Sequence, residues 1–421
     1  MKSTVLASTP YRYQDRRPAH SVERISFVVL FAGFMLANVY DIGGEHGYKY
    51  AGFGLLLPIV ISGILNFRMD ARALVGFGSI FVLWPLAGLF LGMANGANRE
   101  DAVSQTTPFV GFVLAMLVAP VLGPRRTIRI FNGVILSAAI LTVAVTVMLR
   151  FNIGHAFVES LPNYLSCHVD PYQGSNQLFR VGERFYLTAT LWLVPSAVYF
   201  IGRRRFVLGI LCWLGLVFSI SKSGALIALL FIFYGMLRSR RRRVWGLVTL
   251  VGGIGAGLAA FPDFGYDVYN AFFAPVSSTR EIRVGHVSSF FDLVRTHPWI
   301  LATGQGTGTP FYSVGTGRLE VRMEVDHIDA IRQHGLPWFL ALSGVCALAV
   351  LRLLRSKDEE RRAVGFALLS MYFAAGTNPQ LISPLFLFFL GGCYLLAQIE
   401  DTGHAGRNPT IRLVPDGLGY A

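Results

Sequence analysis

The stretch "IFNGVILSAAILTVAVTVML" (residues 130–149) decides the fold, because no charged side chain interrupts it. Roughly 20 mostly apolar residues are enough for a helix to cross the hydrocarbon core of a bilayer. Arginines bound the stretch, with Arg129 directly before it and Arg150 directly after it. The stretch therefore predicts a membrane-spanning helix between these two arginines.

The composition of the whole chain extends this prediction. Of its 421 residues, 53% are hydrophobic and only 14% are charged, whereas a soluble protein carries about 25% charged residues. No region has a soluble composition over the length of a domain, so residues 1–421 are expected to form a single integral membrane domain. The 4 cysteines include no C-x-x-C pair, and no convincing metal-ligand spacing is present. We therefore expect no disulfide framework, no metal and no other cofactor.

We predict twelve membrane-spanning helices, at 25–41, 50–66, 73–93, 107–122, 130–149, 185–201, 206–220, 223–237, 244–261, 336–353, 363–377 and 384–398. The chain is thus expected to be an all-α polytopic membrane protein with two long loops, at 150–184 and 262–335. The first loop is rich in Pro, Asn, Gly and Ser, which predicts irregular structure.

The basic residues predict the orientation. Most of the 37 lysines and arginines, including the clusters "GRRRF" and "RSRRRR", fall on the same side as the N-terminus. Because basic residues gather on the cytoplasmic side, both termini are expected on the cytoplasmic side of the membrane. The two long loops are then expected on the outer side. The net charge of +13 is accordingly a topology signal and does not indicate a nucleic-acid partner.

The cations left in the two long loops are all arginines: Arg150, Arg180, Arg184, Arg280, Arg283, Arg295, Arg318, Arg322 and Arg332. A guanidinium offers a fixed fork of donors that matches phosphate and carboxylate groups. These arginines therefore indicate an anionic ligand at the outer membrane–water boundary. The alternative, that individual arginines only pair with nearby acidic residues or lipid headgroups, stays open.

Two parts of the second loop have a readable pattern. Apolar residues at helical spacing predict an amphipathic helix over 278–296, lying along the membrane surface with Arg280 and Arg283 at one end of its apolar face. The apolar stripe is Val284, Val287, Phe291 and Val294. The following string "GQGTG" is interpreted as a flexible turn, because no strand–turn–helix context supports a phosphate-binding loop.

The stretch "EVDHIDAIRQHGLPWFL" (residues 324–340) places carboxylates and imidazoles directly before an apolar segment. We expect it to continue the tenth span outward as one helix, with Glu324, His327, Ile331 and His334 on a single stripe. Its first turns would face the arginines of the loops.

Four stretches, in this order, resemble motifs of the Wzy-type polysaccharide polymerases and O-antigen ligases, a superfamily of bacterial membrane glycosyltransferases. They are "RVGERFY" (180–186), "FSISKSGALIALL" (218–230), "SSTREIRVGHVSSFFDLVRTHPWILATGQGTG" (277–308) and "EVDHIDAIRQHGLPWFL" (324–340). In the first of them Gly182 stands one residue earlier than in the family. The resemblance implies a mostly helical membrane fold related to the class C glycosyltransferases. It also implies a place in the bacterial inner membrane, with both termini in the cytoplasm and the two long loops, which carry the active site, in the periplasm.

The resemblance also implies a reaction: metal-independent, inverting transfer of a glycan from undecaprenyl diphosphate to a sugar hydroxyl of a lipid-linked repeat unit. Arg283 would stabilise the leaving diphosphate, and Glu324 would act as the general base, with His327 as the second candidate. The residues implied in binding the diphosphate are Arg180, Arg184, Arg280 and Lys222. The ligases carry a histidine–asparagine pair where this chain has Glu324, which favours the polymerase branch over a ligase acting on the lipid A core.

Alternative functions of a different class are a polysaccharide flippase or exporter, or a scaffold of an export complex. A transporter predicts internal repeats or a charged central cavity, and the sequence indicates neither. The partners expected for a polymerase are the lipid-linked donor and acceptor and the bilayer; candidate protein partners are a chain-length regulator and an export complex. Whether the product is exopolysaccharide, capsule or O-antigen stays open.

Overall fold

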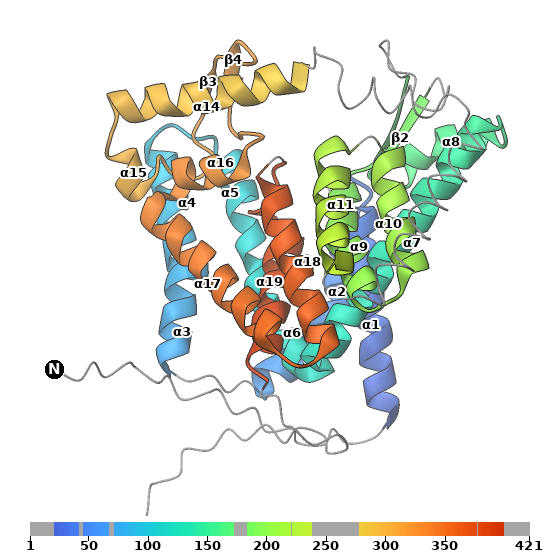
Figure 1. Cartoon of the computed structure of the whole chain (residues 1–421). Coiled ribbons are helices and arrows are strands. Elements are labelled where there is room, and N and C mark those ends of the chain that lie inside the picture. The colour runs from blue at the N-terminus through green and yellow to red at the C-terminus, as the bar shows by residue number, and fades with distance from the viewer. Residues whose placement is uncertain are drawn as a thin grey trace, which may run out of the picture.

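The computed structural model describes residues 21–41, 45–66, 71–171, 183–219, 221–237, 278–376 and 378–399. Over this part of the chain the protein is almost entirely helical, with two small two-stranded antiparallel sheets (Figure 1). The predicted ninth span, 244–261, lies outside the described residues.

The elements up to the first long connection are helical segments, apolar except for the polar Arg99–Thr106. They are α1 (Ser21–Tyr40), α2 (Tyr48–Leu65), α3 (Ala71–Gly78), η1 (Ser79–Leu83), α4 (Trp84–Ala94), α5 (Arg99–Thr106), η2 (Thr107–Phe109), α6 (Val110–Leu122) and α7 (Pro124–Arg150). The connection then holds α8 (His155–Ser160), η3 (Leu161–Asn163), β1 (Cys167–Pro171) and β2 (Glu183–Leu187).

The remaining elements return to the bundle and build a cap on it. They are η5 (Thr190–Trp192), α9 (Leu193–Gly202), α10 (Phe206–Phe218), α11 (Lys222–Leu237), α14 (Ser278–Thr296), α15 (Ile300–Thr303), β3 (Phe311–Ser313), β4 (Arg318–Glu320), α16 (Asp326–His334), α17 (Leu336–Arg355), α18 (Glu359–Ala375) and α19 (Pro384–Ala397).

Helices occupy the predicted spans that fall within the described residues, and five are long and apolar enough to cross a membrane. These five are Tyr48–Leu65, Ala73–Ala94, Arg99–Leu122, Pro124–Arg150 and Leu336–Arg355. The predicted start of the sixth span, residue 185, was wrong. Residues 185–187 belong to strand β2, and the helical part begins with η5 at Thr190 and α9 at Leu193. The first connection is likewise more ordered than its composition predicted, because β1 and β2 pair in register with Cys167 opposite Leu187.

Large apolar side chains on α2, η1 and α4 face outward. Leu65 is 80% exposed, Phe90 65% and Leu83 64%. A water-soluble monomer rarely leaves contiguous apolar surface of this kind uncovered. The exposed side chains therefore agree with an all-α membrane protein whose rim contacts lipid.

The centre of the bundle is formed by two short helices that are apolar on every side. In α9 each residue from Leu193 to Ile201 is buried, and in α19 all residues from Leu385 to Cys393 are buried. A helix that is apolar all round belongs in a protein interior. Phe131 of α7 packs between Trp192, directly before α9, and Phe389 of α19, with ring centroids 5.4 Å and 4.9 Å away.

The two ends of the bundle differ, and each gathers elements from distant parts of the sequence. At one end Glu360 of α18 accepts hydrogen bonds from Arg129 of α7 and Arg203 after α9; we call this the Glu360 end. At the other end lie α14, α16 and both small sheets (Figure 1); we call this the α14 end. The described parts of the two loops predicted to share one side thus lie at the same end of the molecule.

Candidate functional site

Helix α14 crosses the α14 end at a large angle to the long helices (Figure 1). Its packed face is Gly285, His286, Ser289 and Phe290, all buried. Phe290 meets Phe311 and Met323 in a small apolar cluster beneath the helix. The helix bounds match the prediction. The apolar stripe, which was expected to lie along the membrane surface, is separate from the face packed on the protein: Val284 is 62% and Phe291 55% exposed.

The central feature of the α14 end is an ion pair between Arg283 and Glu324. The Arg283 Nε donates to Glu324 Oε2 at 3.1 Å. The two side chains are 30% and 35% exposed, so the pair is held in place yet open to a ligand. The structure thus brings together the two residues that the resemblance names first.

His286, one turn after Arg283 on α14, holds the backbone at the same position. Its Nδ1 accepts a hydrogen bond from the Glu324 backbone N–H at 3.1 Å. Burial lowers the pKa of His286, against the opposing pull of the Glu324 carboxylate, and this favours the neutral imidazole that can accept at Nδ1. Helix α14 therefore contacts Glu324 at two points: Arg283 binds its carboxylate, and His286 binds its backbone N–H.

His286 is a site residue that the sequence analysis did not single out. The available signal was its position three residues after Arg283, which places both side chains on one face of a helix. What the sequence could not show is that residue 324 lies opposite that face.

The stretch from residue 324 does not continue the tenth span, so that expectation was wrong. Glu324 precedes α16, which begins at Asp326 and ends at His334. Gly335 has a φ of 84° and starts the separate helix α17. That positive φ breaks the helical path, and an L-residue with a side chain rarely adopts it.

His327, the second candidate base, faces away from α14. Its ring lies 4.7 Å from the ring of Tyr372 and 5.8 Å from that of Phe339, on α18 and α17. Burial lowers its pKa, and Nε2 has no hydrogen-bond partner among the described residues. The structure therefore places His327 in the wall between α16 and the bundle, whereas Glu324 contacts α14.

Two residues flanking Glu324 tie the site to the connection between α18 and α19. Arg322 donates to the carbonyl oxygens of Pro379 at 3.3 Å and Ile382 at 3.2 Å. Asp326 accepts hydrogen bonds from the backbone N–H groups of Leu381 and Ile382. Burial raises the pKa of Asp326 to about 7, although Arg322 and these amides act in the opposite direction.

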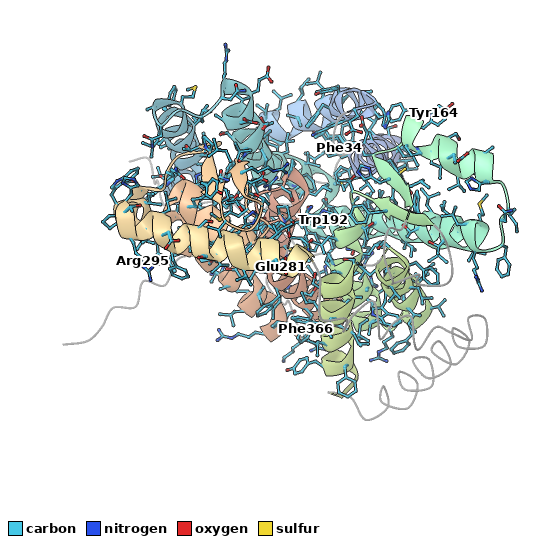
Figure 2. All side chains as sticks on the ribbon, turned by 90° about the horizontal axis from the view of Figure 1, so that it is seen from above. Phe34, Tyr164, Trp192, Glu281, Arg295 and Phe366 are labelled. Carbon is cyan, nitrogen blue, oxygen red and sulfur yellow. The ribbon has the colours of Figure 1, made fainter. Side chains whose placement is uncertain are left out.

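The same connection reaches the start of α11. Asn378 donates to the Ser223 hydroxyl at 3.3 Å, and Ser223 follows Lys222. Figure 2 shows the Glu281 end of α14 directed toward α11, with Arg295 at the far end of the helix. The second, third and fourth motif stretches thus meet at the α14 end, and β2, which holds residues 183–186 of the first stretch, lies at the same end.

For the other residues expected to bind the diphosphate, the structure describes the backbone position of three and not their side chains. Arg280 lies in the first turn of α14, Lys222 is the first residue of α11, and Arg184 stands in β2 opposite Asp170. The side chains of these three basic residues lie outside the described part of the structure, and Arg180 lies outside it entirely.

Arg332 was expected among the arginines that bind an anionic ligand, and this expectation was wrong. The residue is buried and has a structural role. It is fully buried and donates to Asp329 Oδ1 at 2.8 Å, to Thr309 O at 2.7 Å and to Val321 O at 2.8 Å. Its guanidinium also lies 4.6 Å from the centre of the Phe311 ring. Arg332 therefore holds the loop beneath α14 together.

Two further loop arginines make local ion pairs. Arg295 pairs with Asp292 at 3.3 Å, and Arg318 pairs with Glu320 at 2.7 Å. Both arginines are strongly exposed, so these pairs add little to stability.

The glycine-rich string forms a turn, as predicted, but the turn is buried and packed and not the flexible one expected. Gly304, Gly306 and Gly308 all have positive φ, at 79°, 95° and 76°. The Thr307 N–H donates to Gly88 O at 2.9 Å, which docks the turn on α4. A side chain on Gly306 would collide with the backbone of Gly92. These glycines allow close backbone packing.

Within the described residues, no group of three or more His, Cys, Asp or Glu side chains is placed to hold a metal ion. No protein-family model matches the chain, and no curated protein matches it either.

Proposed function

We propose that this protein is a bacterial polysaccharide polymerase that transfers a glycan from undecaprenyl diphosphate to a sugar hydroxyl of a second lipid-linked repeat unit. The observation that supports it most is the accessible ion pair between Arg283 and Glu324. It joins a guanidinium and a carboxylate from two motif stretches at the end of an apolar helical bundle. A lipid-linked substrate would present its head group at such a boundary.

Arg283 would stabilise the leaving group. When the bond from the anomeric carbon to the diphosphate oxygen breaks, the electron pair stays on the diphosphate. A guanidinium can meet this growing charge with charge-assisted hydrogen bonds. Arg280, one turn earlier on α14, together with Arg180, Arg184 and Lys222, is proposed to hold the diphosphate before the reaction.

Glu324 would accept the proton from the attacking sugar hydroxyl. The new bond forms between that oxygen and the anomeric carbon, on the face opposite the leaving diphosphate, so the configuration inverts. A positioned general base contributes typically 10²–10⁴ in rate. His286 helps in this role by fixing the main chain of Glu324, whereas His327, packed against Tyr372, is the second candidate for the base.

The ion pair also gives the free enzyme a resting state. Without substrate, the Glu324 carboxylate neutralises Arg283. An incoming diphosphate competes for the guanidinium and releases the carboxylate toward the acceptor hydroxyl. Binding of the donor and activation of the base are thereby coupled.

The proposal is tested with purified protein in lipid vesicles and a defined lipid-linked repeat unit, with product length as the readout. Arg283→Ala is expected to lower the transfer rate by about 10²–10³, and Glu324→Gln by about 10²–10⁴. The matched control is Arg295→Ala, an arginine at the far end of the same helix with its own acidic partner. Full activity of Arg283→Ala would reject the catalytic role.

The other readings give different products in the same assay. A ligase would require added lipid A core and would not lengthen the lipid-linked repeat alone. A flippase or exporter would move the repeat unit across the vesicle without forming a new glycosidic bond. Either result overturns the polymerase proposal.

A further inference from the structure

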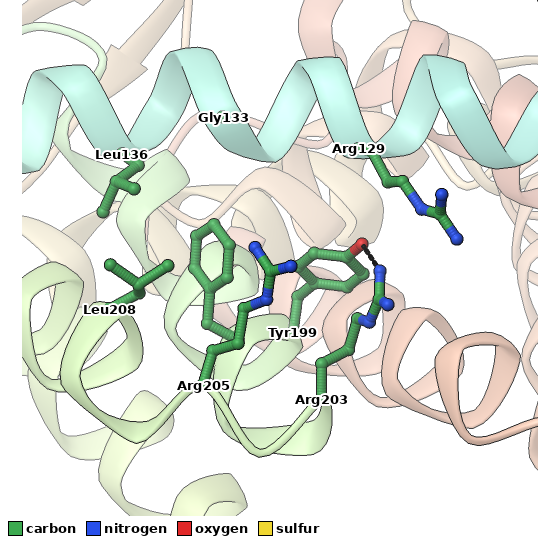
Figure 3. A pocket seen from close by; sticks show the side chains of 8 residues that line it. Arg129, Gly133, Leu136, Tyr199, Arg203, Arg205 and Leu208 are labelled. Carbon is green, nitrogen blue, oxygen red and sulfur yellow. Dashed lines mark hydrogen bonds between the residues drawn. The ribbon is translucent and has the colours of Figure 1, made fainter.

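The Glu360 end of the bundle holds a cavity of about 210 Å³ between α7, α9 and α10 (Figure 3). Arg129, Arg203 and Arg205 line it on one side, and Leu136 and Leu208 line it on the other. The cavity therefore combines a basic wall with an apolar one. It lies at the opposite end of the molecule from Arg283 and Glu324 and does not depend on the proposed function.

The acidic residue at the basic wall neutralises only part of its charge. Glu360 pairs with Arg129 at 2.5 Å and with Arg203 at 2.6 Å. Arg203 also donates to the hydroxyl of Tyr199 at 3.1 Å, as Figure 3 shows. One carboxylate facing two guanidiniums leaves a net positive charge at this wall.

Arg205 adds a further positive charge. Within the described part of the chain its exposed side chain has no ion-pair partner. In Figure 3 it projects from the turn between α9 and α10 toward α7, beside Tyr199. Its guanidinium is thus available to an anion in the cavity.

The apolar wall is open to the surroundings at Gly133. This glycine of α7 is exposed, and a Cβ added to it would meet no atom within 4 Å. Nearby on α10, Val207 is 74% exposed. The mouth of the cavity therefore lies on the apolar rim of the bundle, where lipid chains would run.

We propose that this cavity binds an anionic phospholipid. Its phosphate would lie on Arg205 and Arg203, and the first part of an acyl chain would lie against Gly133, Leu136 and Leu208. Basic pockets between membrane helices suit lipid head groups of this charge. A free phosphate ion would use the arginines but would gain nothing from the apolar wall.

The test measures lipid binding to the purified full-length protein in detergent by native mass spectrometry. The probes are phosphatidylglycerol and phosphatidylcholine with identical acyl chains, each with and without millimolar inorganic phosphate. We expect preferential binding of phosphatidylglycerol that phosphate does not displace. Equal binding of the two lipids, or displacement by phosphate alone, would overturn the proposal.

Two pairs of variants locate the binding. Arg205→Gln should weaken phosphatidylglycerol binding about five-fold, the effect of one basic residue near a lipid surface, whereas Arg205→Lys should retain most of it. The control is Arg204→Gln, because Arg204 pairs with Glu359 and does not line the cavity. An equal loss in the Arg204 and Arg205 variants would indicate general surface charge and reject the site.

The steric pair is Gly133→Phe against Gly133→Ala. The phenylalanine should fill the mouth and lower binding, whereas the alanine methyl group fits without contact and should leave binding unchanged. Melting temperatures in detergent without added lipid show whether each variant is folded. Unchanged phosphatidylglycerol binding in a folded Gly133→Phe protein would also reject the site.

Discussion

Gly285 of α14 lies directly against Gly315 in the turn between β3 and β4, so close that a Cβ on Gly285 would come within 2.2 Å of the Gly315 Cα. Backbone atoms cannot yield to such a contact as a flexible side chain would. This glycine pair therefore sets how closely α14 lies over the loop that carries Glu324. It also explains why a helix predicted from its apolar spacing tolerates a glycine at its centre.

Gly285→Ala is expected to destabilise the protein and weaken the Arg283–Glu324 pair. Alanine improves helix propensity by about 1 kcal/mol, but overpacking typically costs about 1–3 kcal/mol, and the contact here is with backbone. The melting temperature should fall. The matched control is Ser288→Ala, at an exposed position of the same helix, which should leave it unchanged or slightly higher; the same response in both variants would contradict the packing argument.

Glu324→Gln should separate binding from transfer. The substitution removes the negative charge that pairs with Arg283 in the resting state, and an exposed ion pair is worth about 0.2–1 kcal/mol. The affinity for a short-chain prenyl diphosphate should therefore rise by up to about five-fold, while the rate of glycan transfer falls by about 10²–10⁴. The measurement is titration calorimetry with farnesyl diphosphate, and weaker binding by the variant would argue against competition at Arg283.

His286 should act by positioning Glu324, and two substitutions distinguish this from simple packing. His286→Leu leaves the Glu324 N–H without its acceptor, a loss of about 1–3 kcal/mol for a buried donor, and should lower kcat about ten-fold with little change in KM. His286→Asn offers an oxygen near the position of Nδ1 and should restore most of kcat. Equal kcat values for the two variants would show that the hydrogen bond to residue 324 does not matter.

The sequence predicted elements whose signal is local. The helix expected at 278–296 is α14 with the same bounds, because apolar spacing within one segment fixes a helix. The cluster "GRRRF" likewise marks the turn between α9 and α10, where Arg203 and Arg204 find Glu360 and Glu359. Charge and periodicity are read from neighbours along the chain, so these features need no tertiary information.

The errors arise where distant segments decide the outcome. In the sequence Arg332 looks like any other loop arginine. In the structure it is buried and donates hydrogen bonds to the carbonyl oxygens of Thr309 and Val321. In the sequence His286 looks like a polar residue of an amphipathic helix. In the structure it is buried and accepts a hydrogen bond from the backbone N–H of Glu324. No spacing rule reports such contacts, because they depend on how the loop folds back beneath α14.

The last prediction concerns acid stability and rests on His334. This side chain is fully buried, 4.4 Å from the ring of Trp338, and neither ring nitrogen has a partner among the described residues. Burial, with a smaller contribution from Arg332, lowers the pKa of His334 to about 3. The folded protein thus binds this proton less readily than the unfolded chain, whose histidine pKa is about 6.5.

Because the pKa of His334 is depressed only in the folded state, the free energy of unfolding has its full value above pH 6.5 and decreases as the pH falls from about 6.5 toward about 3, by at most about 1.4 kcal/mol per pH unit. His334→Leu removes the group, so the variant should lose less stability than the native protein over this window. Asp326, whose raised pKa acts with the opposite sign, is present in both proteins and cancels in the difference. The measurement is the melting temperature of both proteins in detergent between pH 7.5 and pH 4; parallel curves would show that His334 does not titrate on unfolding.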